Sequence, residues 1–183
     1  MYKAGKLFVR SIQQKDEGSL VKWLSNPTVL EFYEGRDKPY NLSMVREDFY
    51  GEEPDIHKCI VEHAGVSIGY IQFYEINERT SDLTGYDKKK TVYGMDQFIG
   101  EPSYWGKGIG TELVQSMLRH LLQRKLADVV VLDPQTTNER AIRCYEKCGF
   151  KKVRRLHAHE FHEGKYRDCW LMEYRKRTDG GNK

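Results

Sequence analysis

The fold of this chain is decided by the stretch Tyr104-Trp105-Gly106-Lys107-Gly108-Ile109-Gly110-Thr111. Three alternating glycines stand directly before a segment whose apolar residues recur at helical spacing: Ile109, Leu113, Val114, Met117, Leu118, Leu121 and Leu122. Glycine lets backbone N–H groups approach a ligand closely, and the N-terminus of a helix attracts anions. The stretch therefore predicts a glycine turn, a helix ending near Lys125, and a site for the pyrophosphate of a nucleotide-like cofactor.

The order of elements around this turn predicts one mixed α/β domain. Strands are expected at 7–12, 58–62, 66–74, 91–99, 128–132, 150–157 and 168–175, and helices at 16–24, 42–50, 109–125 and 138–147. Asn41 is expected to cap the second helix, Thr137 or Asn138 the fourth, and Gly149 to close the fourth. Residues 31–40 and 77–90 are expected to be irregular. The domain should span 1–177, followed by a disordered polar tail at 178–183.

Two other glycine-rich nucleotide sites do not fit this order. A Rossmann domain alternates strands and helices, and it carries an acidic residue about twenty positions after the glycines. Here three predicted strands precede the glycine turn with no helix between them. A P-loop needs Gly-Lys-Ser or Gly-Lys-Thr at a fixed spacing, and the chain has none there. The turn therefore belongs to another class of anion site.

The composition is that of an ordinary globular protein. The 183 residues are 39% hydrophobic and 31% charged, with a net charge of +3 and no dominant block of Lys or Arg. This argues against a nucleic-acid partner, and no apolar run is long enough for a membrane span or a signal peptide. We expect a cytoplasmic protein with reduced thiols at Cys59, Cys144, Cys148 and Cys169. No metal site is expected, because the spacing of His157, His159 and His162 fits no standard one.

A second motif accompanies the glycine turn. It runs Asn138-Glu139-Arg140-Ala141-Ile142-Arg143-Cys144-Tyr145-Glu146-Lys147-Cys148-Gly149-Phe150. It matches Asn-x-x-Ala-x-x-x-Tyr-x-x-x-Gly-Phe at every position, and the two motifs together resemble the cofactor site of the GNAT superfamily of acetyl-CoA-dependent N-acetyltransferases. The first GNAT motif is Gln/Arg-x-x-Gly-x-Gly/Ala. Gly108 and Gly110 fit this motif, but Trp105 stands where Gln or Arg is usual.

Further segments are similar to aminoglycoside 6′-N-acetyltransferases within that superfamily, including the acetyltransferase half of bifunctional acetyltransferase–phosphotransferase enzymes. They are Leu30-Glu31-Phe32-Tyr33-Glu34-Gly35, the strand from Val92 to Pro102, and Leu132-Asp133-Pro134. The resemblance implies a GNAT fold, in which a mixed sheet splays between the strands of Asp96 and Asp133 and is flanked by helices. It also implies direct transfer of the acetyl group of acetyl-CoA to the 6′-amine of an aminoglycoside in a ternary complex, which gives antibiotic resistance.

The resemblance assigns the cofactor site residue by residue. It implies acetyl-CoA contacts at Gln97, Ile99, Trp105, Gly106, Lys107, Gly108, Ile109, Gly110, Thr111, Asn138, Ala141, Tyr145 and Lys147. Backbone N–H groups near Gln97 and Ile99 would hold the thioester oxygen as charge develops. Tyr145 would act as the general acid that protonates the leaving thiolate, and Tyr93 is a further catalytic candidate. Packing as a half-buried aromatic residue is the alternative role for Tyr145.

Asp96 is the candidate for the catalytic base. An Asp in the middle of an otherwise apolar or aromatic strand is disfavoured by propensity, so its presence needs a reason. A carboxylate there could accept the proton of the attacking amine and attract a cationic substrate. Capping a bulge in the strand is the structural alternative. Asp133 ends the next strand and, by the resemblance, contacts the substrate.

Carboxylates crowd one quarter of this net-basic chain, as a polycationic substrate would require. They are Glu31, Glu34, Asp37, Glu47, Asp48, Glu52, Glu53 and Asp55. Phe32 and Tyr33 lie among them and could pack on sugar rings. The predicted substrate contacts are Glu31, Phe32, Tyr33, Asp96 and Asp133. The run 47–55 could equally be a solvated helix face.

Two alternative functions stay open. Another GNAT acyltransferase, acting on a protein N-terminus, a polyamine or a siderophore precursor, would share the cofactor motifs and differ at the substrate face. A non-enzymatic CoA-binding module would bind acetyl-CoA without transferring its acetyl group. Either a monomer or a homodimer is compatible with the sequence.

Overall fold

One mixed sheet of eight strands forms the centre of the molecule. The structure is a computed structural model that describes residues 1–77, 83 and 85–176. The strands are β1 Tyr2–Ala4, β2 Leu7–Ser11, β3 Ile56–His63, β4 Val66–Glu75, β5 Val92–Ile99, β6 Val129–Leu132, β7 Lys151–His162 and β8 Lys165–Arg175. Their order in the sheet is β1-β2-β3-β4-β5-β6-β8-β7. The pair β5–β6 is parallel, and the other neighbouring strands of the described sheet are antiparallel.

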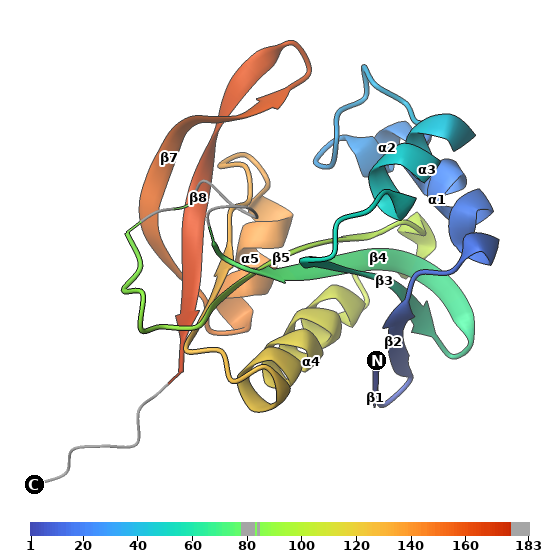
Figure 1. Cartoon of the computed structure of the whole chain (residues 1–183). Helices are drawn as coiled ribbons and strands as arrows, with labels where there is room; N and C mark the ends of the chain where they lie inside the picture. The colour runs from blue at the N-terminus through green and yellow to red at the C-terminus, as the bar shows by residue number, and fades with distance from the viewer. Residues whose placement is uncertain (78–82, 84, 177–183) are drawn as a thin grey trace, which may run out of the picture.

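Helices cover both faces of this sheet. They are α1 Glu17–Leu24, α2 Pro27–Leu30, α3 Leu42–Tyr50, α4 Ile109–Arg124 and α5 Glu139–Lys147, with short 3₁₀ turns at Gln14–Asp16 and Pro102–Tyr104. Figure 1 shows α1–α3 grouped on one side of the sheet and α4 on the other. Each side has its own apolar cluster, one built from α4, α5 and the sheet and the other from α1–α3 and the sheet. This three-layer mixed α/β architecture is the one expected from the sequence.

Local sequence signals account for the helices that flank the site. The stripe predicted for α4 is buried at Leu113, Met117 and Leu121, which explains why this helix lies flat on the sheet. The side chain of Asn41 accepts a hydrogen bond from Met44 N–H, and that of Asn138 accepts one from Ala141 N–H. Both helices α3 and α5 therefore begin at a side-chain cap. Of the two caps considered for α5, the structure selects Asn138.

The parallel strands β5 and β6 separate partway along their length. Only residues 92–94 of β5 pair with β6, opposite its residues 129–131. Beyond Gly94, β5 continues to Ile99 along β4 alone. Strand β6 ends at Leu132, just before Asp133. This is the splay that was expected between the strands of Asp96 and Asp133, and it opens the sheet where the site lies.

The structure adds elements that the sequence pattern did not predict. Strand β1 and the one-turn helix α2 were missed, because three or four residues are too few to show a periodicity. The closing hairpin is longer than the expected 150–157 and 168–175, because β7 runs on to His162 before a tight turn at Glu163 and Gly164. Both turn residues have positive φ, 51° and 75°. The expected tail at 178–183 lies outside the described residues, as does much of the loop expected at 77–90.

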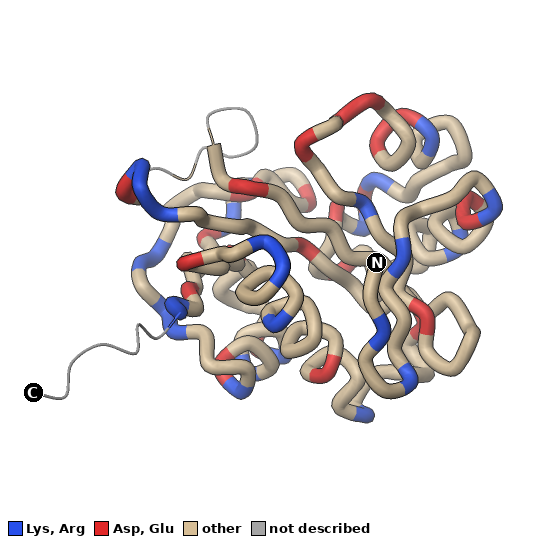
Figure 2. Tube along the Cα trace, turned by 60° about the horizontal axis from the view of Figure 1, so that its bottom comes forward, with Lys and Arg blue, Asp and Glu red and all other residues tan. Residues whose placement is uncertain are grey.

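Positive and negative residues are mixed along the described chain. Lys and Arg are interspersed with Asp and Glu along the trace rather than gathered on one face (Figure 2). No helix in the described ranges combines the length and the apolar character that crossing a membrane requires.

Gly100 provides a test of the packing that joins β5 to the helical layer. A Cβ atom at Gly100 would lie 2.2 Å from Cγ of the Trp23 ring, and Trp23 is 1% exposed. Gly100→Ala should therefore lower the free energy of unfolding by about 1–3 kcal/mol, measured by urea denaturation. Gly18→Ala in α1 is the matched control, because nothing lies within 4 Å of its Cβ position and Ala favours a helix. Equal destabilisation by the two substitutions would contradict this account.

Candidate active site

Two cavities adjoin where β5 and β6 separate. The first, here called the glycine-turn cavity, has a volume of about 350 Å³ and is lined by Gly106, Gly108, Gly110 and residues of α5. The second, here called the acidic cavity, has a volume of about 330 Å³ and is lined by four carboxylates, Glu34, Asp96, Asp133 and Glu160. Both cavities share five lining residues, Phe32, Tyr33, Gln97, Asn138 and Tyr145. A ligand extending through both would pass these five.

The glycine turn presents backbone donors to the first cavity. Gly106 and Gly108 have φ of 73° and 79°, a conformation that other residues rarely adopt. Gly108 is the N-cap of α4, so the N–H groups of the first turn, Ile109 to Thr111, have no partner within the helix. No heavy atom lies within 4 Å of the Cβ positions of Gly106 or Gly108, so a ligand can approach this backbone. The turn therefore has the geometry that the sequence predicts for an anion site.

Trp105, the residue that departs from the usual motif, has two specific contacts. Its indole Nε1 donates a hydrogen bond to the carbonyl of Ile99 at 2.8 Å, which fixes the ring. The guanidinium of Arg140, from the first turn of α5, lies 3.9 Å above the ring centroid. Such stacking on Trp holds an Arg in place while leaving its N–H donors available. Trp105 thus stacks on an arginine from α5 at the edge of the glycine-turn cavity.

Tyr145 lies at the junction of the two cavities. Its hydroxyl accepts a hydrogen bond from Gln97 Nε2 at 2.6 Å, so its own proton is free to point towards a ligand. The residue is 9% exposed. Burial raises the pKa of this phenol far above its usual value. Tyr145 is therefore a protonated donor throughout the neutral range.

Asp96 is held in the acidic cavity by a short chain of hydrogen bonds. Its Oδ2 accepts from Gln72 Nε2 at 2.9 Å, and Gln72 Oε1 accepts from the hydroxyl of Tyr70 at 2.8 Å. Gln72 and Asp96 face each other across β4 and β5. Burial and the nearby charge of Asp133 raise the pKa of Asp96 to about 6. This carboxyl is largely ionised at neutral pH and yet has a higher proton affinity than an ordinary Asp.

The remaining walls of the acidic cavity come from distant parts of the chain. Asp133 Oδ2 lies 3.0 Å from His159 Nε2 of β7. Glu160, the next residue of β7, accepts a hydrogen bond from Gln135 Nε2 at 3.0 Å. Glu34, from the segment after α2, has its pKa raised by burial. Four carboxylates and one histidine therefore converge on one space, which favours a ligand with several positive charges.

A family model described as an acetyltransferase (GNAT) domain matches residues 13–158. The chain belongs to this family.

This GNAT chain is similar in sequence to curated proteins and in fold to solved structures. The aminoglycoside N(6′)-acetyltransferase type 1 of Klebsiella pneumoniae is 29% identical over 147 residues, which is 79% of this chain and 73% of that protein. A kanamycin resistance protein of Rhizobium radiobacter is 43% identical over 61 residues, 33% of this chain and 56% of that protein. A crystal structure of the aminoglycoside acetyltransferase AAC(6′)-Ib with coenzyme A and kanamycin has a TM-score of 0.74 at 27% identity, covering 93% of this chain and 95% of that one.

The GNAT chain brings most of the predicted cofactor residues together. All of them line the glycine-turn cavity except Lys107 and Ile109. Ile109, the first residue of α4, is 7% exposed and packs in the apolar core. Lys107 is exposed, with its ammonium 5.9 Å from the centroid of the Tyr104 ring. The lining residues that were not predicted include two cations, Arg140 and Arg143, although with Lys147 their spacing of three and four marks one basic face of α5.

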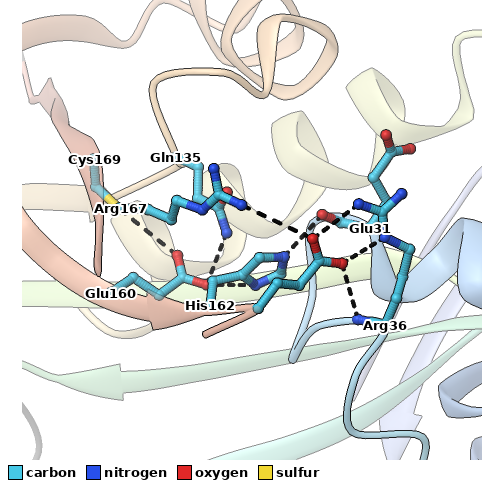
Figure 3. A network of polar contacts seen from close by, with 8 residues as sticks. Glu31, Arg36, Gln135, Glu160, His162, Arg167 and Cys169 are labelled. Carbon is cyan, nitrogen blue, oxygen red and sulfur yellow. Dashed lines mark hydrogen bonds and ion pairs between the residues drawn. The ribbon is translucent and has the colours of Figure 1, made fainter. Parts of the chain in front are cut away.

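Some of the predicted substrate and catalytic residues line the acidic cavity, and others do not. Phe32, Tyr33, Asp96 and Asp133 line the acidic cavity, but Glu31 does not. Its side chain is exposed, and its main-chain carbonyl accepts a hydrogen bond from His162 (Figure 3). Tyr93 lines neither cavity, because it precedes the splay and packs in the core at 8% exposure.

The acidic run at 47–55 forms local contacts away from both cavities. Asp48 accepts a hydrogen bond from the hydroxyl of Tyr40, and Glu53 forms an ion pair with Lys58. No residue of this run lines the acidic cavity. The structure therefore favours the alternative of a solvated run over substrate contact, although the helix ends at Tyr50 and 51–55 lie beyond it. Gln72, His159 and Glu160 line the cavity without having been predicted, and His159 and Glu160 reach it only through the extension of β7.

The coupling between Asp96 and Asp133 can be measured directly. Asp133→Asn removes the charge that helps to raise the pKa of Asp96, so the Asp96 carboxyl should titrate below pH 6 in the variant. Carbon-13 NMR of the side-chain carboxyl across pH 4–8 would follow this shift. The exposed Asp55 lines neither cavity, and Asp55→Asn is the matched control. An unchanged Asp96 titration in Asp133→Asn would contradict the coupling.

Proposed function

We propose that this chain transfers the acetyl group of acetyl-CoA to the 6′-amino group of aminoglycosides. The observation that carries the proposal is the junction at Tyr145 of an anion-binding cavity with a cavity of four carboxylates. A cosubstrate with phosphates fits the first cavity, and a small polycation fits the second. The names of the similar proteins, which include aminoglycoside acetyltransferases and a kanamycin resistance protein, support the same choice.

The glycine-turn cavity suits the phosphates and pantetheine arm of acetyl-CoA. The N–H groups that follow Gly108 can bind the pyrophosphate, and the cations Arg140 and Lys147 at the cavity wall add charge. The splay beyond Gly94 leaves backbone groups of β5 without a β6 partner, so an extended arm can lie beside this strand as an added strand would. This path brings the thioester to Gln97 and Tyr145.

The side chains around that point can carry out the transfer. Asp96 attracts the substrate ammonium and accepts one of its protons, which frees the amine to attack the thioester carbonyl. Backbone N–H groups of β5 near Gln97 and Ile99 stabilise the negative charge that develops on the carbonyl oxygen. The C–N bond forms and the C–S bond breaks. Tyr145 then donates its proton to the departing thiolate and recovers one from the acetylated nitrogen through solvent.

We place the reaction in the cytoplasm, where thiols stay reduced. All four cysteines, Cys59, Cys144, Cys148 and Cys169, are free in the structure. The extent of the domain, 1–177, and the choice between monomer and homodimer stay predictions.

The proposed activity is tested by release of the CoA thiol. Purified protein with acetyl-CoA should release thiol with kanamycin, which carries a 6′-amine, and not with an analogue that has a 6′-hydroxyl. Asp96→Asn should lower kcat/KM by about 10²-fold or more, because the general base is lost. In the unaltered protein kcat/KM should fall tenfold per pH unit below about pH 6, since the ionised form of Asp96 is needed.

The outcomes of this assay separate the candidate functions. Turnover of spermidine but not of any aminoglycoside would overturn the substrate proposal and favour a polyamine acyltransferase. Binding of acetyl-CoA without transfer to any amine would favour a CoA-binding module.

The role of Arg140 is tested on the cosubstrate side. Arg140→Ala removes a cation held at the glycine-turn cavity by Trp105, so KM for acetyl-CoA should rise about tenfold while kcat stays nearly constant. Arg119→Ala is the matched control, because Arg119 is exposed on α4 and lines neither cavity. Equal KM values for acetyl-CoA in the two variants would show that Arg140 does not contribute to binding the cosubstrate.

A further inference from the structure

A set of contacts joins the two walls of the acidic cavity. One wall is the segment after α2, which supplies Phe32, Tyr33 and Glu34, and the other is the β7–β8 hairpin, which supplies His159 and Glu160. In Figure 1 the hairpin projects beyond the sheet on the side where α1–α3 lie. The two walls are more than 120 residues apart in the sequence, so tertiary contacts must set their separation.

The first of these contacts is a forked ion pair at the hairpin tip. Arg36 Nε and Nη2 donate to the two carboxylate oxygens of Glu163 at 2.5 and 2.8 Å, and the backbone N–H of Arg36 donates to the same carboxylate at 3.2 Å (Figure 3). Arg167 of β8 lies 3.9 Å from Glu163. The hydrogen bonds from Arg36 lower the pKa of Glu163 to about 2, so this carboxylate stays ionised wherever activity is measured.

The second contact is buried and leads directly into the cavity. His162, at 2% exposure, lies with Nε2 3.0 Å from the main-chain carbonyl of Glu31. Its Nδ1 lies 3.4 Å from Glu160 Oε1, and Glu160 is one of the carboxylates that line the acidic cavity. The carboxylate of Glu160 is also held by Gln135. The hairpin tip and a substrate-facing carboxylate are thus parts of one network (Figure 3).

The backbone on both sides is shaped for this contact. Glu34 and Gly35 have φ of 65° and 105°, and Glu163 has φ of 51°. A non-glycine residue with positive φ is uncommon and costs conformational energy that its surroundings must offset. A Cβ atom on Gly35 would lie 3.5 Å from Cγ of Glu163 and 2.7 Å from Oδ1 of Asp37. Gly35 therefore lies directly against the residue that Arg36 binds.

We propose that Glu31, Arg36, His162 and Glu163 form a clasp that fixes the width of the acidic cavity and so positions Phe32, Tyr33, Glu34 and Glu160 for the polycationic substrate. The clasp residues are positioning residues. They act through the cavity walls, chiefly on the affinity for the substrate, because only Phe32 and Tyr33 of the residues they position also line the glycine-turn cavity. This inference rests on the proposed function for the identity of the substrate.

An exposed ion pair between two surface side chains contributes little on its own. The clasp differs because its carboxylate accepts three hydrogen bonds and because it is continuous with a buried histidine. Loss of the Arg36–Glu163 pair should therefore weaken substrate binding several-fold without abolishing it.

The test is a double-mutant cycle read out on KM. Arg36→Ala and Glu163→Ala should each raise KM for kanamycin about fivefold, with kcat and KM for acetyl-CoA changed less than twofold. The double variant should show no more than the effect of one single variant, because the pair acts as a unit. A fall in kcat with unchanged KM, or additive effects of the two substitutions, would overturn the clasp.

The chain offers a matched control for this cycle. Arg46 and Glu17 form a similar forked pair at 3.0 and 2.9 Å, with side-chain exposures of 55% and 13% against 50% and 18% for Arg36 and Glu163. This pair joins α3 to α1 and lines neither cavity. Arg46→Ala and Glu17→Ala should leave KM for kanamycin unchanged. An equal rise in KM in the control variants would show a general effect of lost ion pairs and overturn the proposal.

A second measurement tests the clasp independently of the proposed function. Amide hydrogen exchange of residues 31–36 should accelerate at least tenfold in Glu163→Ala and not in Glu17→Ala. If the unaltered protein acetylates no aminoglycoside, the proposed function fails, and the exchange result alone decides the clasp. Unchanged exchange in Glu163→Ala would overturn the clasp whatever the activity.

Discussion

The separation of β5 from β6 after Gly94 is the constraint on which the site depends. At Gly94 itself a Cβ atom would lie 2.7 Å from the Tyr74 ring, so the last paired position has no room for a larger residue. Because the two strands are parallel, their carboxyl ends lie at the same edge of the sheet. The glycine turn follows β5, and the cap Asn138 follows β6. One opening in the sheet therefore brings together the anion site of α4, the basic face of α5 and the carboxylates Asp96 and Asp133.

At this opening positive and negative side chains are separated, although they are interspersed along the rest of the described chain (Figure 2). Arg140, Arg143 and Lys147 line the glycine-turn cavity, whereas four carboxylates line the acidic cavity together with the imidazole of His159. Tyr145 and Gln97 lie between them and are uncharged in the neutral range. An anionic cosubstrate and a cationic substrate are thus drawn into opposite ends of one channel, and the reacting groups meet where neither set of charges dominates.

The sequence predicted the parts of this arrangement that are encoded locally. The apolar stripe of α4 and the caps Asn41 and Asn138 depend on residues within one or two turns, and the structure has all of them. His159 and Glu160 were missed because they reach the cavity only if β7 continues past an irregular register between Leu156 and Glu160. For a related reason the sequence did not show that Tyr93, the further catalytic candidate, lines neither cavity. A strand pattern shows which residues share a face, but it does not show where a neighbouring strand stops pairing.

The surroundings of Asp96 meet two opposing requirements of the base proposed at this position. Burial and the charge of Asp133 raise its pKa, and the hydrogen bond from Gln72, itself fixed by Tyr70, opposes that rise. With its pKa raised to about 6, the Asp96 carboxyl is still mostly ionised at pH 7, yet it binds a proton more strongly than an ordinary Asp. An unperturbed carboxylate would be fully ionised but a weaker base. A fully desolvated and unpartnered one would be protonated and unable to accept a proton, so Gln72 matters to the proposed chemistry through its hydrogen bond to the Asp96 carboxylate.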